Sequence, residues 1–194
     1  MLAKIFKVLV FILLPLFGYS QQENRLQYRD YRSEIGVRTG YSHLHQELPD
    51  NKYYRPLLIL PYFNYYLTSN LRRSRLSLIL EPQIVHVSVK TRKNPVFERE
   101  LAVTYGLQYQ IAFRYFLIYT AVTTGPNYIT VNTPRQASGF IFSDNIMLGV
   151  KRKLIGSTFF DLQYRFRHIS NAGLNYPNWG IDNHFVIFGL SAFL

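Results

Sequence analysis

The feature that most constrains this chain is an alternation of apolar and polar residues that recurs in segment after segment. It is strict at residues 160–167 (FDLQYRFR), where even positions are apolar and odd positions are polar or charged. A period of two residues is typical of a β-strand with one apolar and one polar face. The same pattern is cleanest at 101–110 and recurs at 35–42, 76–84, 113–119, 140–150 and 184–194. Together with 57–67, which is apolar on both faces, these segments predict eight strands.

The connections between these segments alternate in length. Long ones lie near residues 50, 93, 130 and 176, whereas the turns near 71, 112 and 153 are short. In an up-and-down order, all long connections fall at one end of the sheet, which is the layout of bacterial outer-membrane barrels. A sheet in lipid must close, because unpaired backbone groups find no water there. The sequence therefore predicts an all-β fold, an eight-stranded antiparallel up-and-down transmembrane β-barrel.

The two faces of the strands predict what fills this barrel. An eight-stranded barrel is just wide enough for side chains to fill its interior, so we expect no pore. The polar face would supply the interior side chains: Arg38, Glu81, Gln108, Asp161, Arg165 and Arg167. The alternative is a soluble barrel or sandwich with an apolar interior, which inverts the faces. It would bury many large aromatic side chains and expose many glycines and glutamines, a less natural division.

The first residues predict export. A short apolar run at 8–17 follows Lys4 and Lys7 and ends before small side chains. This pattern is typical of a signal peptide over 1–20, leaving the barrel over 21–194; a retained anchor is the alternative. The chain has no cysteine, so neither a disulfide framework nor a thiolate site is available. Its 22 basic residues against 11 acidic ones suit anionic lipid or polysaccharide better than nucleic acid.

Two residues with catalytic chemistry continue the apolar series of residues 160–167. His168 and Ser170 occupy even positions, so a base and a nucleophile lie on the apolar face of a strand. A hairpin symmetric about Asn175 would place Asp182 beside His168 on the neighbouring strand. A serine nucleophile needs a base, and the base needs a group that orients it. The pattern therefore indicates a site that faces lipid and acts on lipid, although such residues also occur in ordinary turns.

Two motifs of this last hairpin, HISNAGL at 168–174 and PNWGID at 177–182, together resemble the signature of the PagL family, the lipid A 3-O-deacylases. The resemblance implies an outer-membrane serine esterase with its catalytic hairpin near 160–194. Such an enzyme removes the ester-linked 3-hydroxyacyl chain at position 3 of lipid A and needs no metal or other cofactor. The implied roles are as follows: His168 as general base, Ser170 as nucleophile, Asp182 as orienting acid, Asn171 and the Gly173 N–H as oxyanion donors, and Asn178 in substrate positioning.

One position departs from the family pattern. The family acid is usually glutamate, whereas Asp182 is one methylene shorter, and we consider Asn183 as a substitute contact. The resemblance further implies lipid A or lipopolysaccharide and membrane lipid as partners, with no nucleic acid, and leaves a homodimer open. It implies a place in the outer membrane of a Gram-negative bacterium, with the active site toward the outer leaflet.

Three other interpretations stay open at this point. The chain could be a non-catalytic structural or adhesive eight-stranded barrel that has kept the turn sequence. It could be a lipid A acyltransferase, which sends the acyl group to an acceptor other than water. His43 and His45 with Glu47 could be read as a metal site, but no second cluster accompanies them, and a loop-edge histidine pair is the better interpretation.

Overall fold

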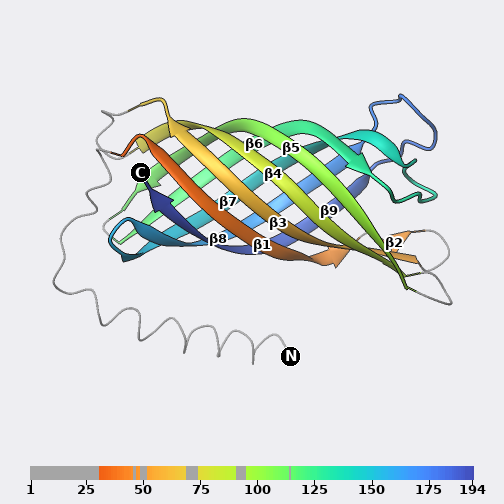
Figure 1. Cartoon of the computed structure of the whole chain (residues 1–194), viewed down its shortest axis with the longest axis horizontal. Helices are drawn as coiled ribbons and strands as arrows, with labels where there is room; N and C mark the ends of the chain where they lie inside the picture. The colour runs from red at the N-terminus through yellow and green to blue at the C-terminus, as the bar shows by residue number, and fades with distance from the viewer. Residues whose placement is uncertain (1–30, 46, 49–51, 69–73, 91–94, 114) are drawn as a thin grey trace.

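The computed structural model describes residues 31–45, 47–48, 52–68, 74–90, 95–113 and 115–194 (Figure 1). The expected signal peptide at 1–20 lies outside these residues. The described chain is built of strands, with the following bounds: β1 (Ser33–His45), β2 (Glu47–Leu48), β3 (Lys52–Tyr66), β4 (Ser74–Lys90), β5 (Pro95–Ala112), β6 (Phe116–Ile129), β7 (Gly139–Ile155), β8 (Thr158–Ser170) and β9 (Ile181–Phe193). Among these residues, no helix is long and apolar enough to cross a membrane.

The strands close into a barrel. Neighbours follow the order β1-β9-β8-β7-β6-β5-β4-β3-β2, and β1 also pairs with β3, so that one continuous antiparallel sheet meets itself. β2 has two residues and only extends the pairing at the start of β3. The eight long strands therefore confirm the eight-stranded antiparallel barrel expected from the sequence. The connections β6–β7 and β8–β9 lie together at one end of the barrel, here named the loop end, opposite the C-terminus (Figure 1).

The faces of the strands follow the predicted parity except in segment 113–119, where Leu117 and Tyr119 of the expected outward series are buried, at 0 % and 1 % exposure. All six side chains expected inside are buried, from Arg38 at 1 % exposure to Arg165 and Arg167 at 0 %. The opposite parity faces outward: Val37, Leu107 and Tyr164 are exposed at 51 %, 44 % and 44 %. Apolar side chains on the outside and charged ones inside are what a barrel in lipid requires. The inverted, soluble barrel is therefore wrong.

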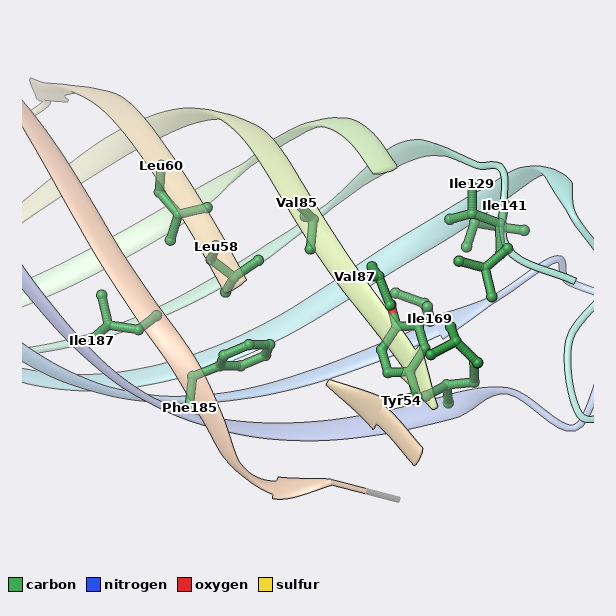
Figure 2. Packing of buried hydrophobic residues seen from close by; sticks show 13 residues of the cluster. Tyr54, Leu58, Leu60, Val85, Val87, Ile129, Ile141, Ile169, Phe185 and Ile187 are labelled. Atoms are coloured by element: carbon green, nitrogen blue, oxygen red, sulfur yellow. The ribbon is translucent and has the colours of Figure 1, made fainter. Parts of the chain in front are cut away.

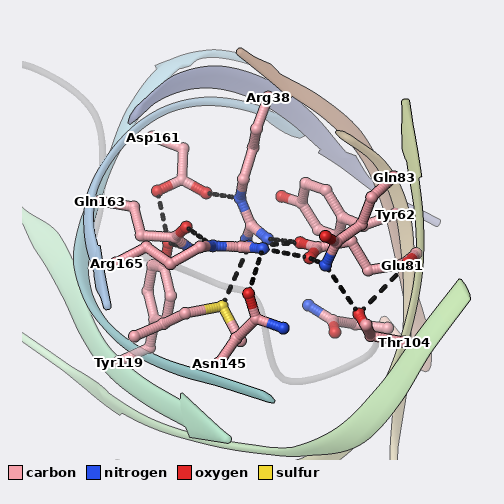
Figure 3. Close-up of polar contacts among 12 residues, drawn as sticks. Arg38, Tyr62, Glu81, Gln83, Thr104, Tyr119, Asn145, Asp161, Gln163 and Arg165 are labelled. Carbon is pink, nitrogen blue, oxygen red and sulfur yellow. Dashed lines mark hydrogen bonds and ion pairs between the residues drawn. The ribbon is translucent and has the colours of Figure 1, made fainter. Parts of the chain in front are cut away.

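A network of charged side chains crosses the middle of the barrel interior (Figure 3). Glu81 accepts hydrogen bonds from both terminal nitrogens of Arg165, at 2.6 and 2.7 Å, and a third from Arg38 at 3.3 Å. Arg38 donates from its Nε to Asp161 at 2.8 Å. Buried charges are tolerated when they are paired and hydrogen-bonded in this way, and loss of one partner costs about 3–5 kcal/mol. The network fills the interior and ties distant strands together.

The interior of the loop end also holds a cluster of apolar side chains, which was not predicted from the sequence (Figure 2). Tyr54 of this cluster bonds to the buried ion pair of Arg167 and Glu100. The ambiguous segment 57–67 turns Leu58 and Leu60 inward, where both are fully buried. They join a cluster that includes Ile169 of β8 and Ile181 of β9. These two isoleucines alternate with the outward-facing residues of the last hairpin. The wall that carries the candidate site is therefore backed by buried isoleucines on one side of the His168–Asp182 pair and by the buried, hydrogen-bonded Arg167 and Asn183 on the other.

Candidate active site

Strands β8 and β9 bring His168 and Asp182 together on the outer face of the barrel. The two residues are direct partners in the register, as hairpin symmetry predicts. Asp182 Oδ1 lies 2.7 Å from His168 Nδ1, and the side chains are exposed at 47 % and 37 %. With the Nδ1 proton donated to the carboxylate, Nε2 is left as the acceptor. The shorter aspartate therefore reaches the histidine. Asn183 instead points inward and accepts a hydrogen bond from Arg167 at 3.1 Å, so its expected role as a substitute contact is wrong.

Ser170 is the last residue of β8 and lies on the same outward face as His168. Residues two apart in a strand are separated by about 6.6–6.8 Å. Within the described chain, no hydrogen bond joins the Ser170 hydroxyl to His168; catalytic hydrogen bonds often tighten only when substrate binds. The partner of Ser170 across β7 is Phe142. The hydroxyl thus sits between an apolar aromatic neighbour and the imidazole.

Gly180 packs directly against the imidazole ring of His168. Its φ of +69° lies in the left-handed region, and a Cβ at this position would lie 2.5 Å from His168 Cε1 and 3.0 Å from Nε2. Neither distance leaves room for a side chain. The backbone of Gly180 and the ring of His168 are therefore in direct contact, and the glycine helps to set the position of the ring.

The predicted oxyanion donors hold the connection between β8 and β9. Gly173 N–H donates to Asn171 Oδ1 at 3.0 Å, and Asn171 Nδ2 donates to the carbonyl of Asn175 at 2.7 Å. Asn178, expected to position substrate, accepts from the Asn171 N–H at 2.8 Å. Ala172 and Gly173 both have positive φ, 52° and 83°. In this arrangement the asparagines fix the turn that follows Ser170.

The connection between β6 and β7 packs against the same turn. Gln136 forms an isolated antiparallel bridge with Asn178. Trp179 N–H donates to the carbonyl of Arg135 at 2.7 Å, and Arg135 Nε donates to the carbonyl of Gly180 at 3.3 Å. Two connections far apart in sequence therefore make one rigid unit next to His168.

A second carboxylate flanks the histidine on the other side. Asp144 of β7 is the register partner of His168 and is exposed on the outer face. It accepts a hydrogen bond from Thr124 of β6 at 2.6 Å. A polar row thus runs around the outer face, from Thr124 through Asp144 and His168 to Asp182. Large apolar side chains such as Ile146 and Val122 are exposed beside this row.

Asp144 and Arg135 were not among the residues predicted from the sequence. Asp144 could have been found, because it is the single acid in the even-numbered apolar series of 140–150, the same signal that singled out His168. Arg135 carries no such signal, since its place depends on two connections meeting in space. The segment predicted at 113–119 is longer in the structure, because β6 continues to Ile129 and includes Thr124.

No group of three or more His, Cys, Asp or Glu side chains suited to a metal ion occurs in the part of the chain that the structure describes. The side chains of His43, His45 and Glu47, considered from the sequence as a metal set, lie outside that part.

The fold and the site together define a class of protein: a small outer-membrane β-barrel with a histidine–aspartate pair and a serine on its lipid-facing surface. Comparison with family models matches residues 61–191 to "Lipid A 3-O-deacylase (PagL)". Because the match covers more than half of the chain, this protein belongs to the PagL family of lipid A 3-O-deacylases. A search of curated proteins gives no match.

Two solved structures resemble this barrel. The crystal structure of the outer membrane enzyme PagL aligns with a TM-score of 0.56 and 15 % identity over 80 % of this chain and 97 % of that one. The attachment invasion locus protein Ail of Yersinia pestis aligns with a TM-score of 0.50 and 11 % identity, over 84 % of this chain and 98 % of that one. At these identities the likeness concerns the fold alone.

Proposed function

We propose that this protein is an outer-membrane serine esterase that removes the 3-hydroxyacyl chain ester-linked at position 3 of lipid A. The observation that carries the proposal is the bond between His168 and Asp182 on the lipid-facing side of the barrel, in a member of a lipid A deacylase family. Ser170 is the nucleophile, His168 the general base and Asp182 the orienting acid. All three come from one chain, so the mechanism needs no second copy.

The reaction proceeds in two halves. His168 Nε2 takes the proton of the Ser170 hydroxyl while its oxygen attacks the ester carbonyl carbon. The bond from that carbon to the sugar oxygen breaks, the sugar oxygen takes the proton from His168, and the acyl group stays on Ser170. Water then gives a proton to His168 and attacks the acyl-serine, which releases the free hydroxy fatty acid and restores the serine. Asp182 holds the ring in one tautomer throughout.

The oxyanion of each tetrahedral intermediate needs hydrogen-bond donors. We assign this role to the Asn171 side chain and the Gly173 N–H. The Asn171 amide has a second hydrogen besides the one that it gives to Asn175. The Gly173 N–H donates to Asn171 in the structure, so its use requires the turn to re-pair when substrate binds. Asn178 supports the same turn through Asn171.

The surroundings of the site fit a lipid substrate at the outer leaflet. Next to the polar row lie apolar outward residues: Ile146, Leu148, Phe166 and Val186. An acyl chain could lie along this surface without leaving the membrane. At the loop end, Tyr176 and Trp179 are exposed at 83 % and 69 %, and such side chains favour the level of the lipid head groups. We therefore place the loop end, and the site with it, toward the outer leaflet.

The experiment that tests this function is incubation of the purified barrel with lipid A in detergent micelles, followed by mass spectrometry. We expect the lipid A to lose one hydroxyacyl group, which appears as free fatty acid. The same acyl group on a second lipid would instead establish an acyltransferase. Unchanged lipid A under all conditions would leave the structural or adhesive barrel as the better account.

The role of Asp182 predicts a graded series. Asp182→Ala should retain a residual rate, with a loss roughly a hundred-fold smaller than that of the serine variant, because the orienting acid usually contributes less than nucleophile or base. Asp182→Glu should stay active, since glutamate is the usual family residue. Initial rates of fatty acid release give the order. An Asp182→Ala variant as fast as the wild type would remove Asp182 from the mechanism.

We further propose that residues 1–20 are a signal peptide removed on export, because a Lys-flanked apolar run is followed by small residues. N-terminal sequencing of protein from isolated outer membranes should begin near residue 21. An intact Met1 in that fraction would show that the segment is retained as an anchor.

A further inference from the structure

Arg135 is held against the catalytic hairpin. Its Nε donates to the carbonyl oxygen of Gly180 at 3.3 Å, and Gly180 is the residue on which the His168 ring rests. Its own carbonyl accepts the Trp179 N–H at 2.7 Å. Only Gly180 therefore separates Arg135 from the proposed general base, His168. Arg135 is held there by hydrogen bonds with backbone groups of the hairpin and not by acidic side chains.

The rest of this guanidinium meets no partner in the part of the chain that the structure describes. Within the described residues, neither terminal nitrogen of the half-buried Arg135 contacts a carboxylate or a carbonyl. The other arginines of the last strands behave differently: Arg165 and Arg167 are each paired with a glutamate, Glu81 and Glu100. Arginine is always charged, and its planar fork matches a phosphate with two parallel hydrogen bonds. The terminal nitrogens of Arg135 can therefore bind an anion from outside the protein.

The proposed substrate brings such an anion to this place. In lipid A, the sugar that carries the ester at position 3 also carries a phosphate on its anomeric carbon. Trp179, which bonds to Arg135, is exposed at the level where head groups lie. We propose that Arg135 binds this phosphate and so selects phosphorylated lipid A and orients the ester toward Ser170. The inference rests on the proposed function and names a binding residue for it.

A binding measurement tests the inference without depending on turnover. Ser170→Ala protein in detergent micelles is titrated with lipid A that carries the anomeric phosphate, and with lipid A from which this phosphate has been removed. We expect the phosphorylated form to bind about tenfold more tightly, the worth of a charge-assisted hydrogen-bonded pair. Adding Arg135→Gln should reduce the ratio to about one, and Arg135→Lys should keep part of it.

Arg99 provides the matched control. It is exposed on β5 at the same end of the barrel, and its backbone pairs with Thr130 rather than with the catalytic hairpin. Arg99→Gln removes the same charge and should leave the tenfold ratio unchanged. Inorganic phosphate should compete with the phosphorylated lipid only, which separates the phosphate contact from general attraction to the micelle.

Two results would overturn the inference. Equal binding of the two lipids by the Ser170→Ala protein would show that no phosphate is recognised. Equal weakening of both lipids by Arg135→Gln would show that the arginine only braces the two connections. Failure of the wild type to deacylate lipid A would instead count against the proposed function, and the binding ratio would still decide whether Arg135 binds phosphate.

Discussion

Replacement of Ser170 or His168 by alanine is expected to abolish the release of hydroxy fatty acid from lipid A while the barrel stays folded. The nucleophile and its base act as a unit, so each single change should lower the rate on the order of 10⁴-fold or more. The double variant should be no slower than either single variant, for the same reason. Mass spectrometry of lipid A after incubation measures the loss of the acyl group directly.

Folding should survive these changes because of where the side chains lie. Ser170 and His168 are on the outer surface, outside both the charged network and the apolar cluster of the interior. The change in electrophoretic mobility on heating, which reports a folded barrel, should match that of the wild type. Ser138→Ala, at an exposed serine of the neighbouring connection, is the control for activity. A Ser170→Ala variant that deacylates at the wild-type rate would exclude the mechanism.

Gly180→Ala is expected to slow the enzyme strongly, although it replaces no residue of the triad. The added Cβ would lie 2.5 Å from His168 Cε1, so the imidazole has to leave its present position beside Asp182. A displacement of about 1 Å in a catalytic group can lower the rate roughly a hundred-fold. Initial rates of fatty acid release, compared at equal amounts of folded barrel, give the size of the loss.

Gly156→Ala separates the steric effect from the backbone effect. Gly156 also has a positive φ, +53°, but nothing lies within 4 Å of the position that its Cβ would take. Alanine in the left-handed region costs about 1–2 kcal/mol at either site. Only Gly180→Ala also displaces the imidazole. Equal activity of the two variants would show that the contact between Gly180 and His168 does not matter for catalysis.

The strand parity and the hairpin register could be predicted from the sequence because each follows from a local rule. Alternation fixes which side chains face lipid, and it correctly placed Arg38 and Arg165 inside. Symmetry of the hairpin about Asn175 correctly paired His168 with Asp182. Both rules depend only on neighbouring residues and on the geometry of an antiparallel pair.

Other features could not be read in this way. The segment 57–67 is apolar on both faces, so parity alone could not assign Leu58 to the interior cluster. The segment predicted at 113–119 ended before Gly125 and Pro126, yet β6 continues through both to Ile129. Proline lacks an N–H and so weakens the ladder on one side, but pairing of Pro126 with β7 is kept. Pairing with neighbouring strands in a closed sheet therefore keeps β6 extended through a glycine and a proline, which normally end a strand.

Contacts between residues far apart in the sequence could not be predicted from it either. The hydrogen bond from Arg135 to Gly180 joins residues 45 positions apart in the sequence, and no local sequence pattern predicts such a contact. The sequence predicted roles toward substrate for Asn171 and Asn178, but not that the same two asparagines also hold the turn itself. Polar residues in a connection serve both purposes, and only the partners that they meet in the folded chain tell the two apart.

The most direct test of the central claim is the origin of the oxygen in the released fatty acid. Purified wild-type protein is incubated with lipid A in water enriched in heavy oxygen, and the products are analysed by mass spectrometry. Hydrolysis of an acyl-Ser170 intermediate predicts free hydroxy fatty acid that carries one oxygen from the labelled water, and none is released by the Ser170→Ala protein. Labelled fatty acid from the Ser170→Ala protein at the same rate, or no fatty acid from the wild type, would contradict the account.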